Sequence, residues 1–97
     1  MNPIKVDYSD EKLRILVEEF ITMQKLDFTF KGVCSYVLYR AMEEERTTNT
    51  GLYECNQLCS TDCERLCFIL RKILNEGRIT CGTDNFAEDT LFVKTKD

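Results

Sequence analysis

Apolar side chains recur at helical spacing near the start of the chain, and this pattern constrains the fold more than any other sequence feature. They follow the i, i+3, i+4 spacing of one helix face, with charged residues between them: Leu13, Leu16, Val17, Phe20 and Ile21. Ser9 or Asp10, just before them, is a suitable N-cap. The pattern predicts an amphipathic helix over about residues 10–25.

Two further segments carry the same period. One covers about residues 31–45, with its apolar face formed by Phe30, Val33, Cys34, Val37, Leu38 and Ala41. The other covers about residues 62–76, with its apolar face formed by Cys63, Leu66, Cys67, Leu70, Ile73 and Leu74. It ends before Gly77, where a glycine suits the left-handed end of a helix. Thr61 and Glu64 have the spacing of a capping box, which predicts the start of this third helix.

The remaining segments predict a small amount of β structure. LDFTF at 26–30 is a brief strand or an extended lead into the second helix, and RITC at 78–81 with TLFVKT at 90–95 predicts a hairpin. Residues 1–8 have no clear period and are expected to be a loosely held tail, while 46–60 is expected to be an insertion or loop. The predicted fold class is mainly α with a small β-hairpin (α+β), in one domain over residues 1–97.

The charge of the chain limits its partners. Seventeen acidic and thirteen basic residues give a net charge of −4, which repels a phosphate backbone or an anionic membrane at long range. Nucleic-acid binding would therefore need a local basic patch. The sequence has no apolar run long enough for a signal peptide or a membrane span, so we expect a cytoplasmic protein without a membrane partner.

The residue types argue against an enzyme. The chain has no histidine, which is the commonest general base and the usual partner of a nucleophilic serine or cysteine. Its four glycines are isolated and form no phosphate-binding loop, and no carboxylates are paired in an apolar context. We therefore expect a non-catalytic protein without a cofactor.

The six cysteines raise the question of a metal site. Four of them recur every fourth residue, at Cys55, Cys59, Cys63 and Cys67. Four thiolates suit a closed zinc site, but this spacing on a continuous helix would spread them over about 18 Å. A zinc site would need the helix to break at Ser60, so that Cys55 and Cys59 fold back toward the other two. We therefore predict free thiols packed against the core, with a disulfide as the alternative in an oxidising environment.

The order helix, extended segment, helix, helix, hairpin resembles a winged-helix (winged helix-turn-helix) domain over about residues 10–95. The resemblance is carried by the phrase RKILNEGRI at 71–79, by DTLFVKT at 89–95 and by FTFK at 28–31. The chain departs from the family in its connection between the second and third helices. The family has a tight turn there, whereas this sequence has about fifteen residues, 46–60.

The resemblance implies a small DNA-binding regulator of transcription whose third helix enters the major groove of double-stranded DNA while its wing touches the backbone. Carried over to this sequence, the DNA-binding candidates are Ser60, Thr61, Arg65, Arg71, Lys72, Arg78 and Lys94. The wing itself is acidic, with Asp84, Glu88 and Asp89, and would repel phosphates.

The alternative is a non-catalytic protein-interaction module: an adaptor, a dimerisation domain or a small inhibitor whose acidic surface meets a basic partner. A basic stripe along the third helix would favour DNA, and continuous acidity around that helix would oppose it. A homodimer formed through the first helix or through residues 46–60 would suit either function.

Overall fold

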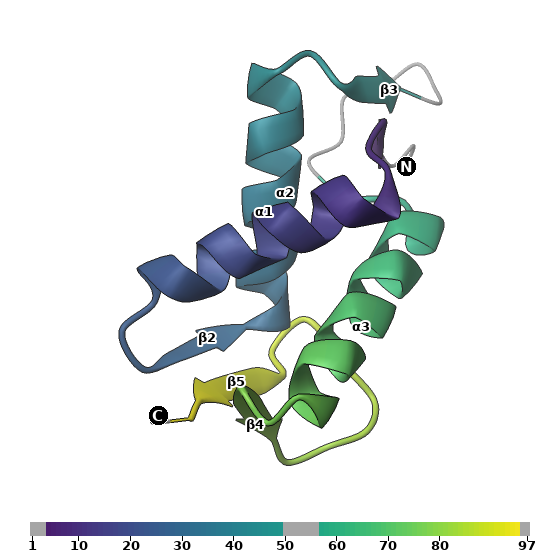
Figure 1. The fold of residues 1–97 in the computed structure, drawn as a ribbon. Coiled ribbons are helices and arrows are strands. Elements are labelled where there is room, and N and C mark those ends of the chain that lie inside the picture. The colour runs from purple at the N-terminus through teal and green to yellow at the C-terminus, as the bar shows by residue number, and fades with distance from the viewer. Residues whose placement is uncertain (1–3, 50–56, 96–97) are drawn as a thin grey trace.

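The computed structural model describes residues 4–49 and 57–95. Within these residues the chain forms three helices, α1 (Asp10–Met23), α2 (Phe30–Glu43) and α3 (Ser60–Asn75). It also forms five short strands: β1 (Ile4–Val6), β2 (Asp27–Thr29), β3 (Thr47–Asn49), β4 (Ile79–Cys81) and β5 (Leu91–Lys94). Figure 1 shows this arrangement, which confirms the predicted α+β class.

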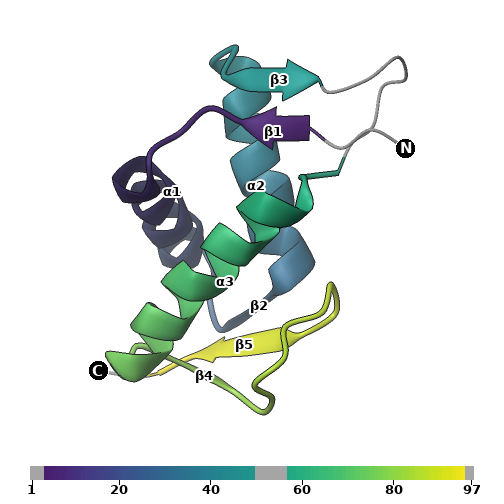
Figure 2. The same cartoon turned by 90° about the vertical axis from the view of Figure 1, so that its right-hand side faces the viewer.

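The strands form two separate antiparallel sheets. The larger has the order β2-β5-β4, so the predicted hairpin strands β4 and β5 pair, and the brief strand β2 pairs with β5 on its other side. The smaller sheet joins β1 to β3. Figures 1 and 2 show that the two sheets lie at opposite ends of the helical part of the molecule.

The start of α3 differs from the predicted capping box. The helix begins at Ser60 with Cys59 as its N-cap, and no side chain caps it. Thr61 and Glu64 therefore lie inside the helix, and the prediction that they form a capping box was wrong. The earlier start allows Asp62 to face the interior, where its carboxylate accepts a hydrogen bond from the Val6 backbone N–H at 2.8 Å.

The expected loose tail is wrong for the part that the structure describes. Residues 4–6 form β1, and the side chains of Ile4 and Val6 are 6% and 1% exposed. The backbone of Ile4 also donates to the Gln57 carbonyl at 2.8 Å and accepts from the Cys59 N–H at 3.0 Å. This strand is therefore held by β3 on one side and by the segment that leads into α3 on the other.

The expected loop over 46–60 also contains regular structure. Residues 47–49 form β3, and residue Ser60 already belongs to α3. Leu58 is buried and forms a β-bridge with Ile4. Residues 1–3 and 50–56 lie outside the described residues.

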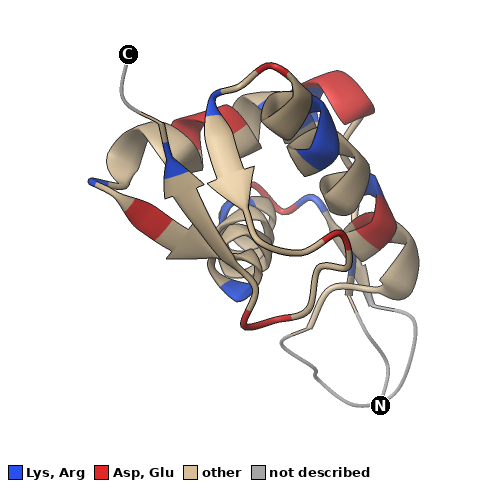
Figure 3. Ribbon diagram, turned by 90° about the horizontal axis from the view of Figure 1, so that it is seen from below, with Lys and Arg blue, Asp and Glu red and all other residues tan. Residues whose placement is uncertain are grey.

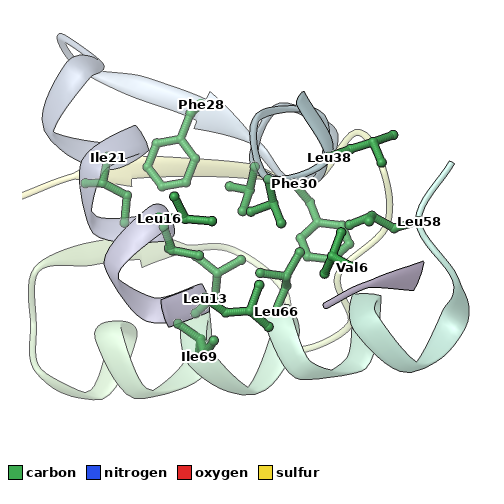
Figure 4. Close-up of a cluster of buried hydrophobic side chains, with 14 of the residues drawn as sticks. Val6, Leu13, Leu16, Ile21, Phe28, Phe30, Leu38, Leu58, Leu66 and Ile69 are labelled. Atoms are coloured by element: carbon green, nitrogen blue, oxygen red, sulfur yellow. The ribbon is translucent and has the colours of Figure 1, made fainter. Parts of the chain in front are cut away.

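The core lies where the three helices and the larger sheet meet (Figure 4). The helical-period residues Leu13, Leu16 and Val17 are fully buried there, as are Leu66 and Leu70 of α3. An aromatic group closes the sheet end, where the Phe28 and Phe92 rings stack with centroids 5.3 Å apart and Phe86 meets Phe92 edge-on at 4.9 Å. Among the described residues, none of the helices combines the length and apolar character of a membrane span.

Candidate interaction face on helix α3

Helix α3 has an apolar inner face and a mixed outer face. Its buried apolar residues, Leu66, Ile69, Leu70 and Ile73, point to the core, and the outer face consists of Thr61, Glu64, Phe68, Arg71 and Lys72. Phe68 lies in the middle of that outer face and is 60% exposed. Single exposed apolar side chains are common on protein surfaces, so Phe68 becomes a candidate binding residue through the hollow that lies beside it.

Arg65, a predicted DNA contact, is engaged inside the molecule. Its guanidinium donates to Asp10 at 2.8 Å, to Asp62 at 3.0 Å and to the backbone carbonyl of Tyr8. The side chain is only 24% exposed. Arg65 therefore joins α3 to the start of α1.

Arg78 is engaged in the same way at the other end of α3. It forms a two-pronged ion pair with Glu18 of α1, one contact being 2.6 Å, while Arg14 of α1 reaches Glu76 at 2.7 Å. The hydrogen bond from Arg78 holds the pKa of Glu18 below its ordinary value, and Arg14 does the same for Glu76. These two arginines and two glutamates neutralise one another between α1 and the end of α3.

Arg71 and Lys72 are different, because neither forms an ion pair within the described residues. The Arg71 guanidinium lies 5.1 Å from the centre of the Phe86 ring and donates to the Asp84 carbonyl at 2.7 Å. The Lys72 ammonium lies 4.6 Å from the centre of the Phe68 ring. Both are exposed and lie side by side in the C-terminal half of α3.

The other predicted contacts are dispersed. Ser60 and Thr61 are exposed at the start of α3, and the Lys94 ammonium on β5 donates to the Gln24 carbonyl at 2.9 Å. Figure 3 shows basic and acidic segments interspersed along the ribbon. The structure thus brings Arg71 and Lys72 together but places the other predicted cations in contacts that the fold itself uses, and their role in DNA binding stays a prediction.

A shallow hollow lies beside Phe68. It has a volume of about 230 Å³ and is lined by Asp10, Thr61, Glu64, Arg65 and Phe68. The carboxylates of Asp10 and Glu64 are exposed at its edge, and the Asp10 side chain is 77% exposed. The hollow therefore places the Phe68 ring beside the carboxylate of Glu64 on α3 and that of Asp10 on α1, the latter already paired with Arg65. An aromatic ring next to a carboxylate is a surface for a cation with an apolar stem.

Sequence reasoning missed Phe68, although the signal was present. The predicted apolar stripe of α3 contains Cys63, Leu66, Cys67 and Leu70. Phe68 lies off this stripe and is flanked at i−4 and i+4 by Glu64 and Lys72, which are typical surface residues. The position of Asp10 beside α3 had no such signal, because it depends on how the two helices pack.

The cysteines form no metal centre in the part of the chain that the structure describes. Cys34, Cys59, Cys63, Cys67 and Cys81 are free thiols there. No group of three or more cysteine or acidic side chains within residues 4–49 and 57–95 is arranged to hold a metal ion. Cys55, the remaining member of the alternative zinc set, lies outside these residues.

Comparison with protein-family models, with curated proteins and with solved structures gave no match to this chain.

Proposed function

We propose that this chain is a non-catalytic protein-interaction module that binds a basic segment of a partner protein on the outer face of α3. The observation that carries the proposal is Phe68, 60% exposed beside a hollow edged by the carboxylates of Asp10 and Glu64. Exposed aromatic residues next to a pocket are common anchors of protein interfaces. Lysine or arginine from the partner would lay its aliphatic stem on Phe68 and direct its charge to the carboxylates.

The electrostatics of the hollow support a basic partner. Arg65 is the one cation among the described residues that line it, and it is already shared between Asp10 and Asp62. Lys72 lies outside this lining, with its ammonium over the Phe68 ring. Glu64 has no ion-pair partner among the described residues. The net charge of −4 adds a long-range attraction for a basic partner, which raises the rate of encounter.

DNA binding through α3 is the second candidate, and one observation favours it. Arg71 and Lys72 are adjacent, exposed and free of carboxylate partners in the described chain, next to the loop that joins β4 and β5. The order of α1, β2, α2, α3 and the β4–β5 hairpin is the one that a winged-helix-like fold implies. We rank this function second because Arg65 and Arg78 are held by carboxylates of α1 and α3.

The proposal is tested with two labelled synthetic peptides of equal length, an amphipathic lysine–leucine helix and its glutamate–leucine counterpart, by fluorescence anisotropy. We expect the lysine peptide to bind, and we expect its affinity to fall as the salt concentration is raised, because salt ions screen the electrostatic part of the attraction. Phe68→Ala should weaken binding about tenfold, the effect of losing about 1.4 kcal/mol at an interface anchor. Glu64→Ala should also weaken it.

Tyr39→Ala is the matched control, because Tyr39 is an aromatic residue of α2 that is also 60% exposed. It should leave peptide affinity unchanged. Equal binding of the glutamate peptide, or an equal loss in Tyr39→Ala and Phe68→Ala, would contradict the proposal. Salt-sensitive binding of a labelled random DNA duplex that is lost in Arg71→Ala/Lys72→Ala, with no binding of the lysine peptide, would establish the second candidate instead.

A further inference from the structure

A second hollow lies between the C-terminal half of α3 and the loop that joins β4 to β5. Its volume is about 390 Å³. Helix α3 contributes Arg71, Leu74 and Asn75 to its lining, and the loop contributes Asp84, Asn85 and Phe86. Among the described residues, it shares none with the hollow beside Phe68. Binding sites for small molecules commonly have volumes of about 300–1,000 Å³, so this hollow has room for a small metabolite.

We propose that this second hollow binds a free α-amino acid with an apolar side chain. The carboxylate of the ligand would meet the Arg71 guanidinium, and its ammonium would meet the Asp84 carboxylate. Its apolar side chain would lie against Leu74 and Phe86. This binding is separate from the interaction proposed for Phe68, and either can exist without the other.

The Arg71 guanidinium is held in place by the fold. It donates to the Asp84 backbone carbonyl at 2.7 Å and lies 5.1 Å from the centre of the Phe86 ring. Phe86 is itself anchored, since its ring centre lies 4.9 Å from that of Phe92 and 6.3 Å from that of Phe30. A guanidinium fixed in this way loses little freedom on binding, and its remaining N–H groups suit the two oxygens of a carboxylate.

The charges of the second hollow suit a ligand that carries both signs. Neither Arg71 nor Asp84 forms an ion pair, with the other or with any other residue that the structure describes. The lining therefore contains one cation and one carboxylate, and neither is neutralised by the fold. A zwitterion such as a free amino acid satisfies both charges, whereas a ligand with a single charge is repelled by one of them.

The surroundings disfavour a simple anion. Asn75 is the last residue of α3, so the negative end of the helix dipole lies beside the hollow. Glu88 and Asp89 add negative charge to the same loop. Both features attract the ammonium of an amino acid and repel the second negative charge of a phosphate ester.

The rest of the lining matches the other parts of an apolar amino acid. Leu74 and Phe86 are partly exposed and provide apolar surface for an aliphatic side chain. The side-chain amides of Asn75 and Asn85 can donate and accept hydrogen bonds, which suits the polar end of the ligand.

The test is a titration of the full isotope-labelled chain with leucine, followed by NMR spectroscopy. We expect saturable shifts of the backbone amide signals of residues 71–75 and 83–86. Leucinamide, which lacks the carboxylate, and N-acetylleucine, which lacks the ammonium, should each bind at least about tenfold more weakly than leucine. The proposal is overturned if either analogue binds as tightly as leucine, or if leucine shifts none of these signals up to its solubility limit.

Four single variants locate the two charges. Arg71→Gln and Asp84→Asn should each weaken leucine binding about tenfold. Lys72→Gln and Asp89→Asn are the matched controls, because each removes a neighbouring charge of the same sign that does not line the hollow. They should leave the affinity for leucine unchanged, and an equal loss in a control and in its matched variant would contradict the assignment. The three ligands compared on the unchanged chain decide the proposal even if a variant does not fold.

Discussion

Asp62 joins three parts of the molecule through one carboxylate. It is fully buried and accepts hydrogen bonds from the Val6 backbone N–H at 2.8 Å, from the Cys59 thiol at 3.3 Å and from the Arg65 guanidinium at 3.0 Å. A buried carboxylate is tolerated only when such donors replace the water that it has lost. Asp62 is thus the point at which β1, the segment before α3 and Arg65 depend on one another.

We therefore expect Asp62→Ala to lower the free energy of unfolding by about 3 kcal/mol, because it leaves the Val6 N–H and part of Arg65 without a partner in the interior. Urea unfolding followed by circular dichroism measures this. Glu64→Ala is the matched control on the exposed side of the same helix and should stay within about 0.5 kcal/mol of the unchanged chain. Similar losses in both variants would show that the contacts of Asp62 contribute little.

At the scale of the elements, Gly77 ends α3 in a conformation that other residues adopt only at a cost. Its φ is +77°, in the left-handed region, and its N–H donates to the Leu74 carbonyl at 2.9 Å. We expect Gly77→Ala to destabilise the protein by about 1–2 kcal/mol through backbone strain alone, since nothing within 4 Å would meet the added methyl group. Thermal unfolding monitored by circular dichroism would show the loss.

Gly82→Ala is the control for that substitution. Gly82 also has open space around it, but its φ is outside the left-handed region. Its replacement should leave the unfolding temperature unchanged or slightly raised, because alanine restricts the unfolded chain more than glycine does. A melting temperature that falls equally in both variants would argue against backbone strain at Gly77.

The helices were predictable from the sequence and β1 was not. The predicted helices at 10–25, 31–45 and 62–76 match α1, α2 and α3 within two residues at each end, because a segment of that length repeats its period several times. A three-residue strand such as β1 offers only two buried positions, Ile4 and Val6, which is too few to show a period. Its partners β3 and Asp62 are also remote in sequence.

In the candidate site too, the feature that depends on local sequence was predictable and the contacts between helices were not. Phe68 could be recognised from its place off the apolar stripe of its own helix, since that requires only local information. The ion pairs of Arg65 and Arg78 could not be predicted from the sequence, because their partners Asp10 and Glu18 belong to α1. Which cations of a helix remain available to a ligand is decided by the packing of one helix on another.

At the scale of the whole molecule, the ion pairs between α1 and the end of α3 make stability depend on pH. Arg78 holds the pKa of Glu18 below its ordinary value of 4.5 in the folded state. A carboxyl with a lowered folded pKa contributes stability that is present above the unfolded value and is lost as the pH falls through the folded value. Acidification below 4.5 should therefore weaken the contact between these two helices.

Glu18→Gln tests this dependence, because glutamine keeps the size of the side chain but cannot titrate. Its urea midpoint should be lower than that of the unchanged chain at neutral pH, and the difference should shrink as the pH falls below 4.5. Glu11→Gln, an exposed position on the same helix, should follow the unchanged chain throughout. A constant difference between Glu18→Gln and the unchanged chain at every pH would show that the titration of Glu18 does not cause the pH dependence of stability.

The pairing of β2 with β5 brings together Phe28 and Phe92, which are separated by more than half of the chain. At the opposite end, Ile4 meets Leu58 in the same long-range manner. These long-range pairings raise the contact order of the fold. The entropy lost in closing the loops must be overcome before either sheet contributes stability, so folding is slower than for a plain helical bundle. Because each closure joins the first half of the chain to the second, neither half contains a complete core, and the cooperativity of folding belongs to the chain as a whole.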